Sequence, residues 1–192
     1  KNKTEKLLRN ILPSRVAEEL KATGKSVPEC FENVTVFFSD IIDFTRISSQ
    51  LPPQTVIEEL SDIFTNFDRI FQRNHCERIK TIGDAYMVVG GLNDDTEEHA
   101  ERVLDVAFGF QDALRAVNRA HKMDFKLRIG VHSGSVIAGV LGIRKFAYDI
   151  WGDAVNTASR MESHGIPDEI QITNSEFFRD IHIQSDGGRS TT

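Results

Sequence analysis

The order of strand-like and helix-like segments restricts this chain to a small set of folds. Apolar residues recur at helical spacing over Pro53–Phe71 and over Glu97–Ala120, which predicts two long amphipathic helices. The other expected elements are a helix over Ala154–Glu162 and strands over Val34–Phe38, Arg78–Ile82, Ala85–Val89, Lys126–Val131, Val136–Leu141 and Glu169–Thr173. The order opens strand, helix, strand, strand, helix, strand. It predicts an α+β fold, a ferredoxin-like split βαβ sandwich with helices packed on an antiparallel sheet.

The two ends of the chain differ from this central part. A helical period over Glu5–Lys21 is interrupted by Pro13, and Gly24–Glu29 has the composition of a linker. We therefore divide the chain into an N-terminal helix and linker (1–29), one main domain (30–180), and a polar tail (181–192) that we expect to be disordered or truncated. The N-terminal helix has two interpretations: it packs on its own domain, or it ends a signalling helix from an upstream regulatory module.

Composition excludes several functional classes. The 192 residues are 40% hydrophobic and carry a net charge of -6, with no basic stripe for a nucleic acid. No apolar run approaches the roughly 20 residues that span a bilayer. The two cysteines, Cys30 and Cys76, are too few for a disulfide framework. We expect a cytoplasmic domain that itself contacts neither nucleic acid nor membrane, and membrane attachment of the full-length protein stays open.

Two aspartates stand beside strand-like runs. Asp40 follows Val34–Phe38, and Asp84 lies in the turn of the expected hairpin. A single aspartate at a strand end usually caps a turn. Two of them on neighbouring strands suit Mg²⁺, which takes one or two carboxylates and completes its coordination with phosphate oxygens and water.

A third segment gives these aspartates a context: Phe-Ala-Tyr-Asp-Ile-Trp-Gly-Asp-Ala-Val-Asn-Thr-Ala-Ser-Arg over 146–160. With Phe38–Thr45 and Arg78–Tyr86, it resembles the catalytic domain of class III nucleotide cyclases, from about Leu7 to about Phe178. The resemblance implies that Asp40 and Asp84 hold two Mg²⁺ or Mn²⁺ ions, with help from the backbone carbonyl of Ile41. It also implies that backbone amides near Phe44 and Thr45 cradle phosphate.

The same resemblance assigns the substrate. In this family, positions matching Lys80 and Asp149 read the purine: lysine with aspartate or threonine accompanies adenine, and glutamate with cysteine accompanies guanine. Adenine offers an acceptor at N1 and a donor at N6, which match an ammonium and a carboxylate. Lys80 with Asp149 therefore implies ATP as substrate, and an adenylyl cyclase.

Three more residues take roles by resemblance. Asn156 and Arg160 are spaced i and i+4, so they share one helix face. The resemblance implies that Asn156 orients the ribose, that Arg160 stabilises charge on the α-phosphate and that Arg128 contacts the outer phosphates. We interpret His132 as structural. Because metal and purine residues of different subunits meet in this family, it also implies a homodimer with two sites at the interface.

The chain departs from the family in two places. Asp43 occupies a position where many members have glycine, and no lysine- and glycine-rich loop follows residue 180. We expect the missing loop to weaken catalysis. Two alternatives stay open: a guanylyl cyclase, which Lys80 and Asp149 disfavour, and a non-catalytic nucleotide-binding dimerisation module.

Overall fold

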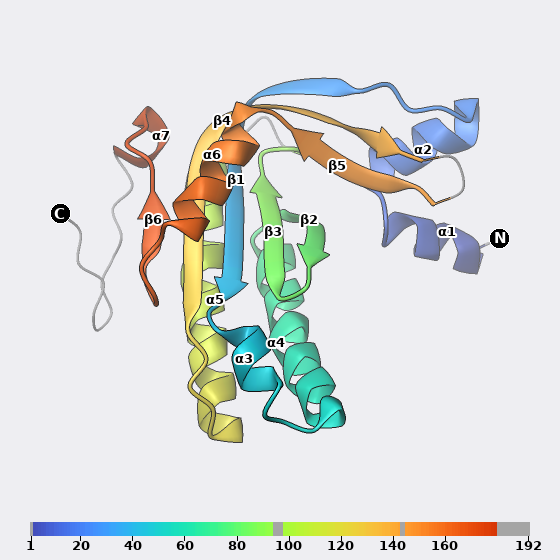
Figure 1. Ribbon diagram of the computed structural model, residues 1–192. Coiled ribbons are helices and arrows are strands. Elements are labelled where there is room, and N and C mark those ends of the chain that lie inside the picture. The colour runs from blue at the N-terminus through green and yellow to red at the C-terminus, as the bar shows by residue number, and fades with distance from the viewer. Residues whose placement is uncertain (1, 94–97, 143–144, 180–192) are drawn as a thin grey trace.

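The computed structural model describes residues 2–93, 98–142 and 145–179, and the predicted tail 181–192 lies outside them. A sheet forms the centre of the fold (Figure 1). Its strands are β1 (Glu29–Ile41), β2 (Glu77–Ile82), β3 (Ala85–Gly90), β4 (Leu127–Leu141), β5 (Ala147–Trp151) and β6 (Ile170–Ile172). The helices are α1 (Asn2–Arg9), α2 (Ser14–Thr23), α3 (Phe44–Ser48), α4 (Pro53–Arg73), α5 (His99–His121), α6 (Asp153–Ser163) and α7 (Glu176–Arg179).

The strand order is β2-β3-β1-β4-β5, and β6 adds to β4 as the one parallel pairing in the described part of the sheet. With helices packed on this sheet, the predicted α+β fold is confirmed. β1 and β4 form the central pair, and their register sets Asp40 opposite Arg128.

Three strands differ from the expectation, and the first is β1, which spans Glu29–Ile41 rather than Val34–Phe38. The strands expected over Lys126–Val131 and Val136–Leu141 form one continuous strand, β4, because the polar residues between them keep their pairing with β1. Ser133 remains buried there and hydrogen-bonds to Thr35 at 2.6 Å. β5 was not predicted, since a segment of five residues is too short to show a clear alternation of apolar and polar residues.

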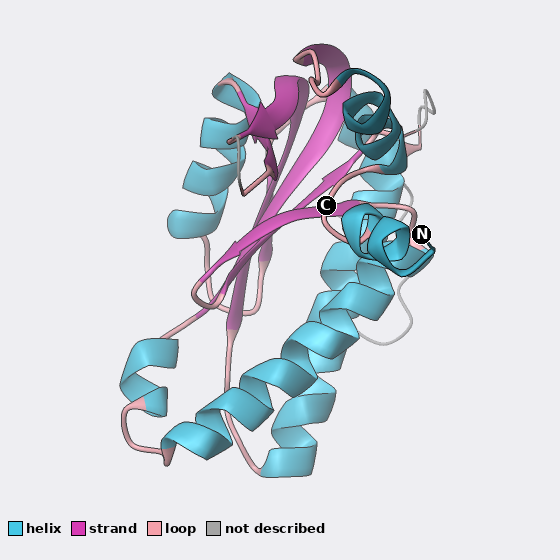
Figure 2. Cartoon of the chain, turned by 90° about the vertical axis from the view of Figure 1, so that its right-hand side faces the viewer, coloured by secondary structure: helices cyan, strands magenta, loops and turns pink. Residues whose placement is uncertain are grey.

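The two faces of the sheet carry different helices. The long helices α4 and α5 run side by side along one face (Figure 2), over a core that includes Phe37, Phe67 and Phe110. The rings of Phe67 and Phe110 stack with centroids 3.7 Å apart. The short helix α6 covers part of the opposite face, over a second cluster that includes Val36 and Met87.

The N-terminal segment forms two helices, with Pro13 between them. Leu12 and Ala17 are buried, so the region around the break is packed. The expected linker ends one residue early, because Glu29 already pairs with Ala138 of β4. Within the described residues, no helix combines the length and the apolar character that a bilayer crossing requires.

Candidate active site

The predicted carboxylate pair lies at adjoining strand ends. β1 pairs with β3, so Asp40 at the end of β1 meets Asp84 in the turn that precedes β3. The backbone amide of Ile41 donates a hydrogen bond to Asp84 Oδ2 at 3.2 Å. The pKa of Asp84 is raised to about 7, mainly by burial and also by the hydrogen bond and the charge of the neighbouring Asp40. Two carboxylates pressed together in this way favour a cation between them.

The donor set suits a metal that completes its coordination with substrate oxygens. Among the residues that the structure describes, no group of three or more His, Cys, Asp or Glu side chains could hold a metal ion. Asp40 and Asp84, with the carbonyl of Ile41, supply two carboxylates and one carbonyl. Mg²⁺ commonly binds to one or two carboxylates together with phosphates and water, so these residues fit it.

α3 begins shortly after the residues predicted to bind metal, Asp40 and Ile41. Asp43 precedes it with a φ of +55°, a left-handed conformation that aspartate tolerates better than most residues. Its carboxylate pairs with Arg46 at 3.1 Å, so part of the charge is offset locally. The ring of Phe44 packs near that of Phe125, with centroids 5.8 Å apart, whereas Thr45 is exposed. The ring of Phe44 is thus partly packed, and its backbone amide stands at the start of α3.

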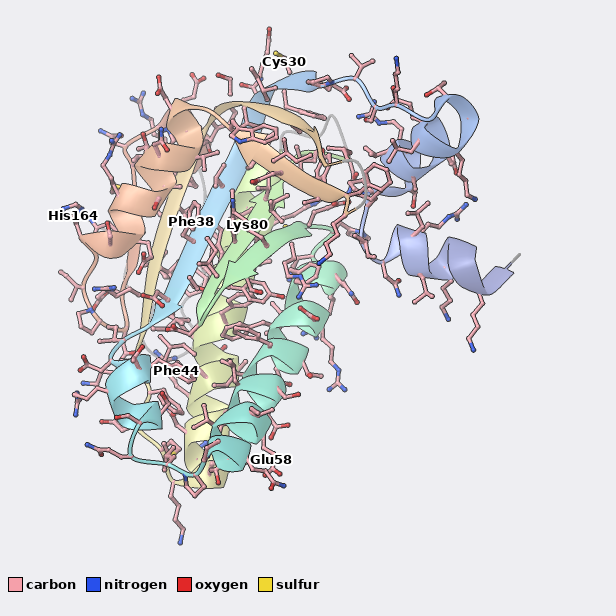
Figure 3. The ribbon with its side chains drawn as sticks, turned by 45° about the vertical axis from the view of Figure 1, so that its right-hand side comes forward. Cys30, Phe38, Phe44, Glu58, Lys80 and His164 are labelled. Carbon is pink, nitrogen blue, oxygen red and sulfur yellow. The ribbon has the colours of Figure 1, made fainter. Side chains whose placement is uncertain are left out.

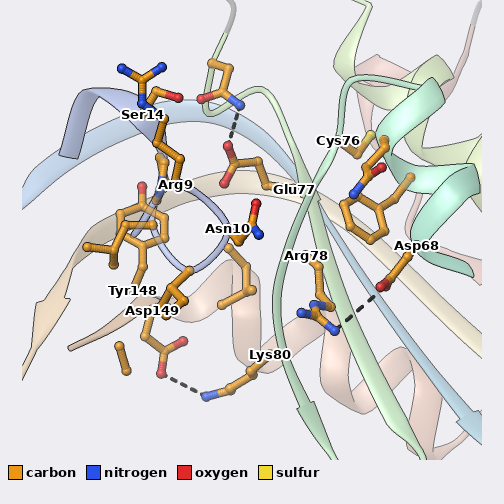
Figure 4. Close-up of a pocket in the computed structure, with 18 of the residues that line it drawn as sticks. Arg9, Asn10, Ser14, Asp68, Cys76, Glu77, Arg78, Lys80, Tyr148 and Asp149 are labelled. Atoms are coloured by element: carbon orange, nitrogen blue, oxygen red, sulfur yellow. Dashed lines mark hydrogen bonds and ion pairs between the residues drawn. The ribbon is translucent and has the colours of Figure 1, made fainter. Parts of the chain in front are cut away.

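The two residues predicted to read the purine meet in the structure although they are far apart in sequence. Lys80 Nζ lies 2.9 Å from Asp149 Oδ2, joining β2 to β5 (Figure 4). The amide of Ile150 donates to the other carboxylate oxygen, Oδ1, at 2.8 Å and fixes its orientation. Both residues line a cavity of about 910 Å³, which also includes Tyr148 and, from the N-terminal segment, Arg9 and Asn10. Figure 3 shows Lys80 on the same side of the sheet as Phe38.

A β-bulge gives Lys80 this direction. Arg78 pairs with Val88 and Lys80 pairs with Met87, so Ile79 is an extra residue in β2. Met87 and Val88 are neighbours in β3, so their side chains face opposite sides of the sheet. The residues that pair with them, Lys80 and Arg78, therefore also face opposite sides. Arg78 consequently reaches Asp68 of α4 at 3.7 Å, while Lys80 points to the other side. Without the bulge, residues two apart would share one face.

The remaining predicted residues lie on α6 and β4. Asn156 and Arg160 are exposed on α6, and neither side chain has a hydrogen-bond partner within the described part of the chain. Arg128 is engaged: a terminal nitrogen lies 3.4 Å from Asp40 Oδ2, and its Nε lies 3.2 Å from Glu162 Oε1. Glu162, the partner of Arg128 Nε, was not predicted as a site residue. Glu162 follows Arg160 by two residues in α6. Its contact with Arg128 of β4 depends on how α6 packs on the sheet, which the local sequence does not indicate.

Most of the chain is similar in sequence to one known protein family. A family profile described as the adenylate and guanylate cyclase catalytic domain matches residues 27–178. The chain belongs to this family. It is thus a class III nucleotide cyclase domain, as predicted from the three motifs.

Relatives of this cyclase domain include guanylate cyclases. A receptor-type guanylate cyclase of Caenorhabditis elegans is 43% identical over 176 residues, which are 90% of this chain and 17% of that protein. The chain thus spans about a sixth of that relative. A guanylyl cyclase domain of the RhoGC fusion protein from the fungus Blastocladiella emersonii, described as a non-canonical dimer, shares 38% identity, with a TM-score of 0.71 over 77% of this chain and 82% of that one.

A third relative bears on nucleotide specificity. It is the catalytic core of a rhodopsin-guanylyl cyclase with converted specificity, in complex with ATPαS. Its sequence is 39% identical, and the TM-score is 0.73 over 78% of this chain and 82% of that chain. Family membership establishes a nucleotide cyclase domain and leaves the choice of purine to the residues at the site.

Proposed function

We propose that this domain is an adenylyl cyclase, which converts ATP to cyclic AMP and pyrophosphate. The observation that carries the proposal is the pairing of Lys80 with Asp149 at 2.9 Å in the cavity between β2 and β5. Lys80 offers a donor for adenine N1, and Asp149 offers an acceptor for the N6 amino group. Guanine presents a donor at N1 and an acceptor at O6. Lys80 would then place a donor against a donor, and Asp149 would place an acceptor against an acceptor. Such unpaired buried groups cost roughly 1–3 kcal/mol each.

The similarity to guanylate cyclases does not contradict this proposal. Those relatives establish the scaffold, and the purine is read by a few side chains that can differ between members of one family. The relative with converted specificity in complex with ATPαS supports the same view, because it has 39% identity to this chain and holds an adenine nucleotide.

The reaction we infer is an in-line attack of the ribose 3′-oxygen on the α-phosphorus. The new bond closes the cyclic diester, and the bond from the α-phosphorus to the bridging oxygen breaks to release pyrophosphate. Asp40, Asp84 and the carbonyl of Ile41 would hold two Mg²⁺ or Mn²⁺ ions. When bound, such ions favour ionisation of the 3′-hydroxyl and stabilise the departing pyrophosphate.

The chain's own side chains supply orientation and charge. Asn156 would hold the ribose, and Arg160 would stabilise charge that develops on the α-phosphate. Both are exposed on one face of α6 and free of competing contacts in the described structure. Arg128 would bind the outer phosphates next to the carboxylate pair, where the structure sets it beside Asp40. Amides near Phe44 and Thr45 would contribute at the start of α3.

We also propose a homodimer in which each site combines residues of two subunits. Ile137 and Trp151 are paired across β4 and β5, and they remain 46% and 40% exposed. Leu141, 50% exposed, lies further along the same side of β4. We expect this exposed apolar row on β4 and β5 to pack against a second copy of the chain. The fungal relative also forms a dimer, although its arrangement is described as non-canonical. The upstream module and the cytoplasmic location stay predictions.

Nucleotide choice is tested by exchanging the purine-reading pair. With Mn²⁺, the domain should form cyclic AMP from ATP and little cyclic GMP from GTP, with products resolved chromatographically. The double variant Lys80→Glu, Asp149→Cys should shift the ATP-to-GTP ratio of kcat/KM by at least roughly a hundredfold towards GTP, because two hydrogen bonds are reversed.

A matched control uses the same substitutions at exposed positions outside the cavity, Lys126→Glu with Asp124→Cys, and should leave the ratio unchanged. An unchanged ratio in the Lys80 and Asp149 variant would refute the assignment. Cyclic GMP as the sole product of the parent domain would establish the guanylyl alternative. No product from a confirmed dimer would favour the non-catalytic module.

The shared site is tested by mixing two inactive variants. Asp84→Asn should inactivate the metal side, and Arg160→Ala should inactivate the α6 side of every homodimer. After mixing and subunit exchange, half of the dimers carry one intact site, so about a quarter of the parent activity should return. Activity that stays at the sum of the separate variants would contradict a site built from two subunits.

A further inference from the structure

Arg128 is held between two carboxylates that belong to different elements. Its Nε donates to Glu162 Oε1 at 3.2 Å, and a terminal nitrogen donates to Asp40 Oδ2 at 3.4 Å. The side chain of Glu162 is only 12% exposed, against 28% for Arg128 and for Asp40. Asp40 already has a role as a proposed metal ligand. Glu162, the more deeply buried partner, has none so far.

The backbone of Glu162 packs directly against β4 at Gly130. A Cβ added to Gly130 would lie 2.1 Å from the amide nitrogen of Glu162 and 2.6 Å from the carbonyl oxygen of Ala158. Gly130 and Arg128 are two residues apart in one strand, so they face the same side. The last turn of α6 therefore rests on the strand beside Arg128, and the position of Glu162 is set by backbone contact.

We propose that Glu162 is a positioning residue, which fixes the guanidinium of Arg128 for the outer phosphates of the nucleotide. The inference rests on the proposed function. A cation bound to Asp40 would compete with Arg128 for its carboxylate, whereas Glu162 would remain at the Nε of Arg128. Anchoring at Nε leaves both terminal nitrogens of the planar guanidinium to face phosphate oxygens as a fork. Lysine could not replace arginine here, because it has no second nitrogen to anchor.

Binding of two nucleotides that cannot cyclise tests this role. 3′-Deoxy-ATP lacks the attacking hydroxyl, and 3′-deoxy-AMP lacks the outer phosphates as well. With Mn²⁺ and the whole domain, Glu162→Ala should weaken binding of the triphosphate about tenfold, the worth of one charge-assisted hydrogen bond. It should leave binding of the monophosphate within about twofold, because Arg128 does not contact it. Glu162→Gln should fall between, since its amide oxygen still accepts from Nε.

The control variant Glu169→Gln removes an exposed carboxylate outside this contact and should change neither affinity. An equal loss for both nucleotides would show that Glu162 acts on the fold as a whole and would overturn the inference, as would an unchanged triphosphate affinity. Thermal melting identifies any variant that fails to fold, and Glu162→Gln, which keeps the size of the side chain, then carries the test.

A double-mutant cycle separates this inference from the proposed function. Arg128→Lys removes the Nε donor, so adding Glu162→Ala to it should cost no further triphosphate affinity. Additive losses would overturn the positioning role. If the parent domain itself binds 3′-deoxy-ATP no better than 3′-deoxy-AMP, the phosphate site fails and the proposed function fails with it. If the parent discriminates and the Glu162 variants still do so equally well, only the inference fails.

Discussion

Asp84→Asn is expected to lower turnover at least roughly a thousandfold, since the cations it would hold contribute several kcal/mol to the transition state. The substitution keeps the shape of the side chain, and the amide oxygen can still accept the hydrogen bond from the amide of Ile41, 3.2 Å from Oδ2. It also relieves the repulsion between Asp84 and Asp40. The metal-free variant should therefore melt no lower than the parent. Loss of activity without loss of stability distinguishes a metal ligand from a structural residue.

The companion measurement is thermal melting with and without Mn²⁺. A ligand that binds to the folded state alone raises the melting temperature, so Mn²⁺ should stabilise the parent and not Asp84→Asn. Asp124→Asn, which alters an exposed carboxylate in the loop before β4, is the control and should behave as the parent. Equal stabilisation of parent and Asp84→Asn by Mn²⁺ would contradict the proposed metal pair.

Gly130→Ala is expected to have the second large effect, on both stability and turnover. The added methyl would meet the amide nitrogen of Glu162 at 2.1 Å and the carbonyl oxygen of Ala158 at 2.6 Å. These are backbone atoms, so no side chain can rotate away, and α6 must move. Overpacking of this kind costs about 1–3 kcal/mol. For a domain of this size we expect the melting temperature to fall by roughly 2–12 °C.

Turnover should fall further than stability alone explains, because Asn156 and Arg160 lie on the displaced helix. Gly139→Ala is the matched control on the same strand: its nearest contacts would be 3.6 Å away, at Pro28 and Trp151, which is ordinary van der Waals distance. It should melt within about 2 °C of the parent, since it adds one methyl without a clash. A Gly130→Ala domain with parent-like melting and turnover would show that α6 can shift freely on β4.

Local patterns in the sequence were enough to find the two long helices, because α4 and α5 each bury one apolar stripe of regular period. They were not enough for the central strands. The polar residues around Ser133 indicate a break, yet they continue the ladder because Thr35 of β1 satisfies the hydroxyl of Ser133 at 2.6 Å. β5 offers too few residues for any periodicity. Pairing between distant segments decided both cases.

By itself, the sequence determined the family, the α+β fold and which residue types stand in the three motifs, because these are encoded in contiguous residues and in spacing. Only the tertiary structure decided how those residues meet. A bulge at Ile79 directs Lys80 away from α4 and towards Asp149, 69 residues later in the chain. The close packing of α6 on Gly130 brings Glu162 to Arg128. The direction of a side chain depends on strand register and on backbone contacts between elements. Neither can be predicted from a short stretch of sequence, because both involve segments far apart in the chain.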